Sequence, residues 1–326
     1  MLFDYENPNF FALSEAQTRQ YVDAHASWQA LEAAQLAAAE VRGSMMWRTQ
    51  NGRRYLVRVS AAGAQTSLGP HSPENEQIYA RFTARKTAVQ ARQKQLRATV
   101  LQHTRINRAL RIGRVPNVVV DTLNALAQAG VQSHFLTVGT HALYAYETAC
   151  GVRVQTEATA TQDIDLLLDT RKYLHFATTM QRLDTSLLGI FQKVDKTFLL
   201  REDQKYTAVN ADGFEIDVIR RSALSKAGTD PHPLRVTAFE DDFWAVQVSS
   251  GQALLDGKRF TQMVVGTSGN MATMHAPSPD SFVRIKTTLS KARDRDPLKS
   301  RKDKLQAMVV QQLLDNHGLR HVVDKV

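Results

Sequence analysis

Residues 161–169 read TQDIDLLLD, and this stretch governs how the rest of the chain is interpreted. Its Ile and Leu residues predict a buried strand. Side chains two positions apart project from the same face of a strand, so Asp163 and Asp165 point together while Ile164 faces the other side. Two carboxylates on one face repel each other unless a cation lies between them. The stretch therefore predicts a metal site, with a solvated strand face as the alternative.

A second acidic strand is predicted downstream, where residues 214–219 read FEIDVI. Glu215 and Asp217 share its polar face. A hard cation such as Mg²⁺ takes oxygen ligands, and three carboxylates on neighbouring strands can hold two metal ions ~3.5–4 Å apart for phosphoryl transfer. We therefore expect Asp163, Asp165 and Asp217 to be the metal ligands. Glu215 is interpreted as an acid that faces water.

The segment before the first acidic strand predicts a phosphate-binding element. Val138-Gly139-Thr140 lies where a buried strand meets a helix expected over 140–149. Glycine lets a phosphate approach the backbone, and a helix N-terminus supplies free N–H groups and a favourable dipole. The Thr140 hydroxyl can donate one more hydrogen bond. We expect Gly139 and Thr140 to bind nucleotide phosphates.

The surrounding pattern predicts an α/β (α+β) fold with a mixed sheet flanked by helices. Helical and strand patterns alternate between residues 118 and 183, and three β-rich stretches follow between 197 and 219. Asn51-Gly52 predicts a small β-hairpin. We expect a helical extension with this hairpin over 1–112, an α/β core over 113–276 and a C-terminal helical region over 277–326.

The basic residues are clustered in a chain of formal net charge +9. Residues 77–120 contain ten Lys and Arg and no acidic residue, and residues 284–304 contain nine basic residues and three acids. Such clusters suit a polyanionic partner such as nucleic acid or nucleotide phosphates, with a solvated helix face as the alternative. We expect the basic residues from Arg81 to Arg114 to bind RNA.

Composition excludes several other classes of protein. A single Cys excludes a disulfide framework or a Cys-based zinc cluster within one chain. The start of the chain has no basic segment followed by an apolar core, so a Sec signal peptide is not expected. No apolar run approaches the ~20 residues of a membrane span. We expect a soluble, cytoplasmic protein.

Several polar or aromatic side chains close to these motifs are interpreted as structural. His134 and His141, expected near the site, are taken as packed and hydrogen-bonded. Tyr144 and Tyr146 are taken as core residues rather than as stacking partners for a base. Asp169 is expected to cap the helix that follows it.

Together these motifs resemble the nucleotidyltransferase superfamily of the polymerase-β type. Its signature is an apolar residue, Gly and a second small residue before a helix, then Asp-x-Asp on the next strand and a third acid on a later strand. The chain is most similar to a bacterial family of this fold with a helical N-terminal extension. The similarity runs from about residues 67–70 through residues 107–110, Gly139–Glu147 and the Asp-x-Asp strand to Pro279-Asp280, Lys286 and residues 301–307. Thr140 replaces the commoner Gly or Ser, and the long separation of Gly139 from Asp163 leaves room for an extra loop at 151–161.

The resemblance implies transfer of a nucleoside monophosphate from an NTP, such as ATP, to an acceptor hydroxyl by a two-metal mechanism with Mg²⁺ or Mn²⁺. The three aspartates would bind metal, Gly139 and Thr140 would cradle the triphosphate, and Lys286 and Lys302 would contact phosphates. Either lysine could instead be solvated. RNA, tRNA in particular, a protein or a small molecule would be the acceptor, and some distant relatives are toxins in toxin–antitoxin systems. The alternatives are a catalytically inactive nucleotide- or nucleic-acid-binding protein of this fold and a metal-dependent phosphohydrolase.

Overall fold

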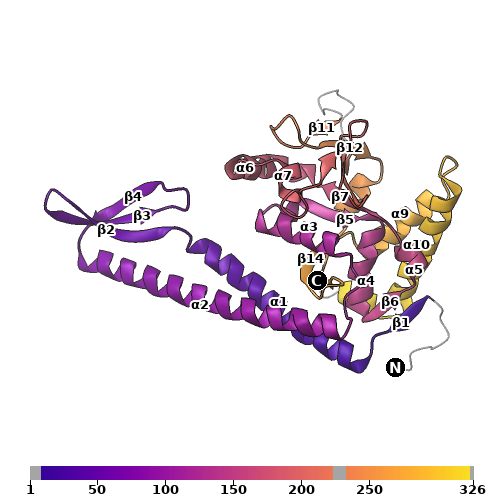
Figure 1. Ribbon diagram of the computed structural model, residues 1–326, viewed down its shortest axis with the longest axis horizontal. Coiled ribbons are helices and arrows are strands. Elements are labelled where there is room, and N and C mark those ends of the chain that lie inside the picture. Colours follow the sequence, from indigo (N-terminus) through magenta and orange to yellow (C-terminus); the bar gives the residue numbers. More distant parts are fainter. Residues whose placement is uncertain (1–8, 223–232, 324–326) are drawn as a thin grey trace. The chain divides into compact units, whose positions relative to one another are not determined.

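The computed structural model describes residues 9–222 and 233–323, and the chain divides into two compact units (Figure 1). We call residues 19–110 the insert unit, because in the sequence they separate the two segments of the other unit, 1–18 and 111–326. The rest of the chain forms the core unit. No helix among the described residues is long and apolar enough to cross a membrane.

A seven-stranded mixed sheet lies at the centre of the core unit. Its strands are β5 (Phe135–Val138), β7 (Asp163–Leu168), β8 (Leu199–Leu200), β9 (Thr207–Val209), β10 (Glu215–Arg221), β11 (Leu234–Arg235) and β12 (Trp244–Val248). The main path has the order β11-β12-β10-β7-β5, and β9 pairs with both β10 and β8. β7 is parallel to β10 and antiparallel to β5.

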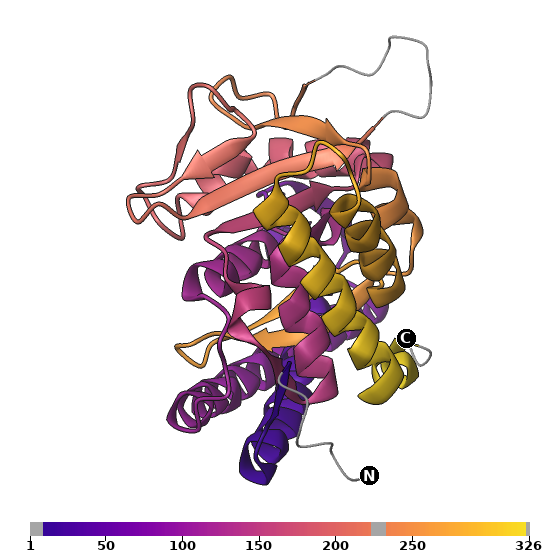
Figure 2. The same cartoon turned by 90° about the vertical axis from the view of Figure 1, so that its right-hand side faces the viewer.

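Helices and a hairpin surround this sheet, which confirms the predicted mixed sheet flanked by helices. The helices are α3 (Asn117–Gln128), α4 (Ala142–Cys150), α6 (Tyr173–Leu183), α7 (Leu187–Phe191), α8 (Gly251–Asp256), α9 (Pro279–Ser290), α10 (Pro297–Asn316) and α11 (Leu319–Val323). The hairpin consists of β13 (Phe260–Val265) and β14 (Met271–Ala276) and packs against α4. Figure 2 shows α9 and α10, in gold, side by side, and they are in contact over much of their length.

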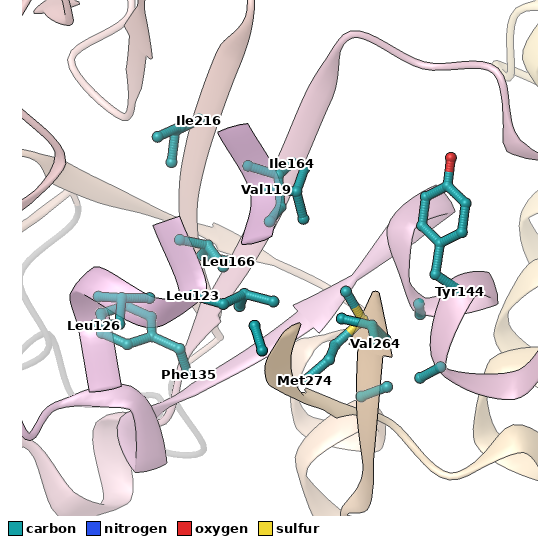
Figure 3. Close-up of a cluster of buried hydrophobic side chains, with 14 of the residues drawn as sticks. Val119, Leu123, Leu126, Phe135, Tyr144, Ile164, Leu166, Ile216, Val264 and Met274 are labelled. Carbon is teal, nitrogen blue, oxygen red and sulfur yellow. The ribbon is translucent and has the colours of Figure 1, made fainter. Parts of the chain in front are cut away.

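The main core lies on one face of the sheet, where the alternation predicted from the sequence is observed. Ile164 and Leu166 of β7 and Ile216 of β10 are fully buried. They belong to the same cluster as Leu123 of α3 and Met274 of β14 (Figure 3). Because successive side chains of a strand alternate between faces, burying these residues directs the acidic side chains of β7 and β10 to the opposite face.

Shorter elements connect these parts. The helix expected from residue 140 begins at Ala142 instead, and a 3-10 turn at Gly139–His141 precedes it. The expected extra loop at 151–161 contains β6 (Val152–Val154), which pairs with β1 (Phe10–Ala12), and the short helix α5 (Thr156–Thr159). A second 3-10 turn, Thr170–Lys172, is capped by the Asp169 carboxylate, so the predicted cap is confirmed.

The insert unit contains most of α1 (Glu15–Glu40), a three-stranded antiparallel sheet and α2 (Pro73–Ala109). The sheet is formed by β2 (Ser44–Gln50), β3 (Arg53–Val59) and β4 (Gln65–Pro70). Asn51 and Gly52 both have positive φ at the predicted hairpin turn. Ser72 caps α2 and Pro73 occupies its first turn, as the sequence predicts. α1 and α2 pack through Leu31, Ala34 and Leu96.

Candidate active site

Three carboxylates converge where β7 and β10 lie side by side. The parallel register places Asp165 opposite Asp217, and Asp163 opposite Glu215. One carboxylate oxygen from each of Asp163, Asp165 and Asp217 lies within 4.8 Å of the other two, and all three residues are partly buried. We call these residues the acidic trio. The structure thus brings together the three acids that the sequence indicates as metal ligands.

The electrostatics of the acidic trio are unbalanced. The pKa of Asp165 is raised from 3.8 to about 7, mainly by burial and in addition by the charges of Asp163 and Asp217. Burial also raises the pKa of Asp217, against the hydrogen bond of 2.6 Å that the Thr207 hydroxyl donates to it. The Thr161 hydroxyl donates to Asp163. Three oxygen donors with uncompensated charge are the donor set that suits a hard divalent cation, so the acidic trio could hold a metal.

Glu215 stands apart from the acidic trio, although it shares the strand face of Asp217. Its carboxylate accepts a hydrogen bond of 2.9 Å from Arg201, which is also close to Asp203. The guanidinium compensates the charge of Glu215, whereas no cation pairs directly with the acidic trio among the described residues. Sequence reasoning identified Glu215 as an acid facing water and did not identify Arg201.

Gly139 is in direct contact with this site because Val138, the last residue of β5, lies opposite Asp165. Gly139 has a φ of 65°, and a Cβ atom on it would overlap Oδ2 of Asp165. Glycine is therefore required for the Asp165 carboxylate to occupy its position, a reason that the sequence pattern does not reveal. Thr140 follows in the 3-10 turn, and its Oγ1 accepts a hydrogen bond of 3.1 Å from Gln306.

Gln306 is a buried side chain that sequence reasoning missed. It lies on α10, and its Nε2 also donates to the carbonyl of Ala158 at 2.8 Å. Its Oε1 has no hydrogen-bond partner within the described part of the chain. The residue therefore ties α10 to the 3-10 turn and to α5 at once. In the sequence it lies just after the basic segment 284–304 and within the similar residues 301–307, and these segments predict phosphate contacts rather than a structural amide.

The two lysines predicted to contact phosphate occupy different environments. Lys302 donates to the carbonyl of Ala160 at 2.6 Å, and burial lowers its pKa while the charge of Asp163 raises it. Lys286 is largely buried and forms an ion pair of 2.7 Å with Asp303. The solvated interpretation of Lys286 is therefore wrong.

Asp303 is a third residue, after Arg201 and Gln306, whose role sequence reasoning missed. Its side chain is only 3% exposed, and it pairs with Arg295 at 2.7 Å as well as with Lys286. It joins α9, the segment after α9, and α10. The charge of Lys286 lowers the pKa of Asp165, so this buried ion pair acts electrostatically on the acidic trio.

The rings near the site are buried, as predicted, but neither ring nitrogen of His141 has the expected hydrogen-bond partner among the described residues. His141 is buried against Tyr144 and Phe214, and burial lowers its pKa to about 4. Tyr146 is fully buried and its hydroxyl donates to the carbonyl of Pro277. His134 is not near the site: β5 is antiparallel to β7, so His134 lies at the far end of β5, where its ring is 3.0 Å from that of His175.

Comparison with known families gives a match over the part of the chain that contains this site. A family model described as nucleotidyltransferase matches residues 117–325, which is more than half of the chain. No curated protein and no solved structure matches the chain. The matched residues include the acidic trio, Gly139, Thr140, Lys286 and Lys302, and they exclude the whole insert unit.

Proposed function

The chain belongs to the nucleotidyltransferase family, and we propose that it transfers a nucleoside monophosphate from an NTP to an acceptor hydroxyl with Mg²⁺ or Mn²⁺ bound by the acidic trio. Family membership supports nucleotidyl transfer with an NTP as the donor. The observation that carries the finer proposal is the convergence of Asp163, Asp165 and Asp217 beside Gly139.

The residues of the trio fit a metal in chemistry and in charge. All three supply carboxylate oxygens, which are the ligands that Mg²⁺ and Mn²⁺ prefer. A bound divalent metal would neutralise their repulsion, stabilise the charge on the phosphate oxygens and favour deprotonation of the acceptor hydroxyl. In this proposal Asp163 and Asp165 hold the donor side. Asp217, oriented by the Thr207 hydroxyl, holds the acceptor side.

The surrounding residues would position the triphosphate. Gly139 and Thr140 form a turn directly beside Asp165, and Gln306 donates a hydrogen bond to the hydroxyl of Thr140. The ammonium group of Lys302 donates to the Ala160 carbonyl and interacts electrostatically with Asp163. Lys286 is held by Asp303 and adds positive potential at Asp165. These cations would offset the charge of an incoming triphosphate.

We propose RNA as the acceptor because of where the charge lies. The insert unit holds 14 Lys and Arg residues against 5 Asp and Glu residues, while the rest of the chain holds 27 of each kind. The entire formal net charge of +9 therefore belongs to residues 19–110. A polyanionic acceptor is attracted by such a surface, and a neutral metabolite is not. We count tRNA among the candidate RNA acceptors.

The test is a labelling experiment with the full-length protein. We would incubate it with each α-labelled NTP, with Mg²⁺ or Mn²⁺, and with total cellular RNA and protein. The Asp163→Ala/Asp165→Ala variant removes two trio ligands, and Asp212→Ala, an exposed acid in the turn before β10, is the matched control. We expect label on RNA with the wild type and the control only.

The alternative of an inactive binding protein makes the opposite prediction. No label would appear on any macromolecule, whichever nucleotide or metal is supplied. The double variant would bind RNA as well as the wild type does. Label on protein instead of RNA would support nucleotidyl transfer and reject the proposed acceptor. Release of inorganic phosphate without any labelled macromolecule would indicate a phosphohydrolase.

A further inference from the structure

The three-stranded sheet of the insert unit carries a hollow of about 460 Å³. Val57 lines it together with six polar residues from β2, β3, β4 and the β2–β3 turn, which are Arg48, Gln50, Asn51, Tyr55, Gln65 and Ser67. Arg48 and Tyr55 lie directly opposite each other across β2 and β3. The hollow therefore spans all three strands and depends on β4.

The hollow lies on the face of the sheet that points away from α2. Trp47 contacts Tyr79 of α2, and the Arg58 guanidinium lies 4.2 Å from the ring centroid of Phe82 on the same helix. Neighbouring side chains of a strand point to opposite faces, so Arg48, which follows Trp47, projects to the open face. The sheet thus uses one face to pack on α2 and leaves the other uncovered by the insert unit.

The polar side chains that line the hollow are available to bind a ligand. Within residues 9–222 and 233–323, none of the six forms a side-chain hydrogen bond or an ion pair. Two arginines on the other face are engaged: Arg54 lies over the Trp47 ring and Arg58 donates to the carbonyl of Arg42. Arg48 is therefore an available cation at the edge of a concave surface.

The charge around the hollow selects a polyanion. Residues 41–73, which contain the whole sheet, include five arginines and no Asp or Glu. An acidic ligand meets no repulsion there, and the rest of the insert unit adds further positive charge. Phosphate binding by itself, however, requires only cations. Five of the six polar residues in the hollow carry no charge, so phosphate binding does not account for them.

The uncharged groups match the chemistry of a nucleobase. Half-buried Tyr55 offers an aromatic face for stacking, and base–aromatic stacking contributes to single-strand binding without requiring a particular sequence. The side-chain amides of Gln50, Asn51 and Gln65 can each donate and accept, as base edges require. A volume of about 460 Å³ admits a group of nucleotide size. Bases stacked inside a duplex could not enter it.

We propose that this hollow binds an unstacked base of a single-stranded nucleic acid, with Tyr55 stacking on the base and Arg48 contacting the neighbouring phosphate. This site goes beyond the proposed nucleotidyl transfer and does not depend on it, because it lies outside the matched residues 117–325 and contains no trio residue. Binding is therefore tested without NTP or metal, so failure of transfer and failure of this site are distinguishable.

The binding experiment uses the full-length protein and a short RNA strand that carries 2-aminopurine, with the same strand as DNA and as a duplex. Stacking on Tyr55 is expected to quench the 2-aminopurine of both single strands and not of the duplex. Tyr55→Leu should abolish the quenching and weaken single-strand binding by roughly 5- to 100-fold, while Tyr55→Phe retains both. Arg48→Gln should lower the slope of log affinity against log salt by about one.

Arg92→Gln is the matched control, because it removes one exposed charge from α2 of the same unit. It should lower the salt slope similarly and leave the quenching unchanged. A second measurement does not depend on any variant folding. RNA containing 4-thiouridine is cross-linked to the wild type and the protein is digested with trypsin, which releases residues 55–58 as one peptide after Arg54. Cross-links in that peptide support the proposal. Cross-links confined to α2, or equal binding of single strands and duplex, overturn it.

Discussion

Replacing Asp165 by Asn should stabilise the metal-free protein while abolishing nucleotidyl transfer. The Asp165 carboxyl is held beside Asp163 and Asp217 in a partly buried position, and its pKa is raised from 3.8 to about 7. Asn has nearly the same shape and no charge, so it removes the repulsion without opening a cavity. The side chain has no hydrogen bond within the described residues whose loss would offset this gain.

The magnitude follows from proton linkage. Between pH 3.8 and 7 the folded protein binds more protons at this site than the unfolded chain does, so wild-type stability falls as pH rises through that window. With these two pKa values, the raised pKa of Asp165 lowers the stability of the folded state by about 2 kcal/mol at pH 5 and by about 4 kcal/mol at pH 8. The stability gained by Asp165→Asn should therefore increase by roughly 2–3 kcal/mol between the two pH values.

The assay is urea unfolding in EDTA at pH 5 and pH 8 for the wild type, Asp165→Asn and the exposed-acid control Asp212→Asn. Comparing each variant with the wild type at the same pH cancels the titration of all groups that do not interact with Asp165. We expect a gain that grows with pH for Asp165→Asn and no pH-dependent change for the control. Added Mg²⁺ should stabilise the wild type more than Asp165→Asn. A gain that is equal at both pH values, or a loss at pH 8, would refute the reasoning.

Two further substitutions test the support of the acidic trio. Gly139→Ala places a Cβ against Oδ2 of Asp165 at a residue with positive φ. We expect the free energy of unfolding, measured in urea, to fall by about 1–3 kcal/mol and the transfer activity to fall with it. Unchanged stability and activity would contradict this packing. Asp303→Asn leaves Lys286 and Arg295 without their buried partner. The free energy of unfolding should fall by about 3 kcal/mol, which is less than the full penalty of an unpaired buried charge because the Arg295 side chain is 30% exposed. Adding Lys286→Met to Asp303→Asn should restore part of that loss, and a strictly additive double variant would argue against the ion pair.

The convergence of the acidic trio could be predicted because it depends on local patterning. Alternation along a strand determines that Asp163 and Asp165 share a face opposite the buried Ile164, and the same rule applies to Asp217 in β10. Hydrophobic burial on one face of the sheet then leaves no other direction for the carboxylates. The roles assigned to these residues stay predictions, whereas their proximity is a property of the fold.

The contacts that support the site could not be predicted, because they connect residues far apart in the chain. Gln306 reaches Thr140 across 166 positions, and Asp303 appeared in the sequence only as one acid among nine basic residues. Neighbouring charges in a helix are equivalent until packing buries one of them. The start of α4 was also misplaced, because local pattern does not separate a 3-10 turn at Gly139–His141 from the helix that follows.

The third strand of the insert unit was missed for a related reason. β4 covers residues 65–70, which read QTSLGP and show no alternation of apolar and polar residues. It forms because β3 offers a free edge, and the register shifts between Leu56 and Val57 where the two strands pair. The hollow lined by Arg48 and Tyr55 could not be recognised without this strand, since Gln65 and Ser67 form its third side.

The distribution of charge limits how the two units can share the reaction. The core unit holds equal numbers of basic and acidic residues, and its acidic trio repels any nucleic acid that approaches without metal. In the proposed reaction with RNA, long-range attraction of the acceptor would come mainly from residues 19–110, which carry the net charge, and locally from the basic segment 284–304. In the same proposal the core unit would contribute the groups that act at short range, such as Lys302 and the turn at Gly139. It follows that salt should weaken acceptor binding strongly and NTP binding only slightly, because screening acts on separated surface charges more than on partly buried ones.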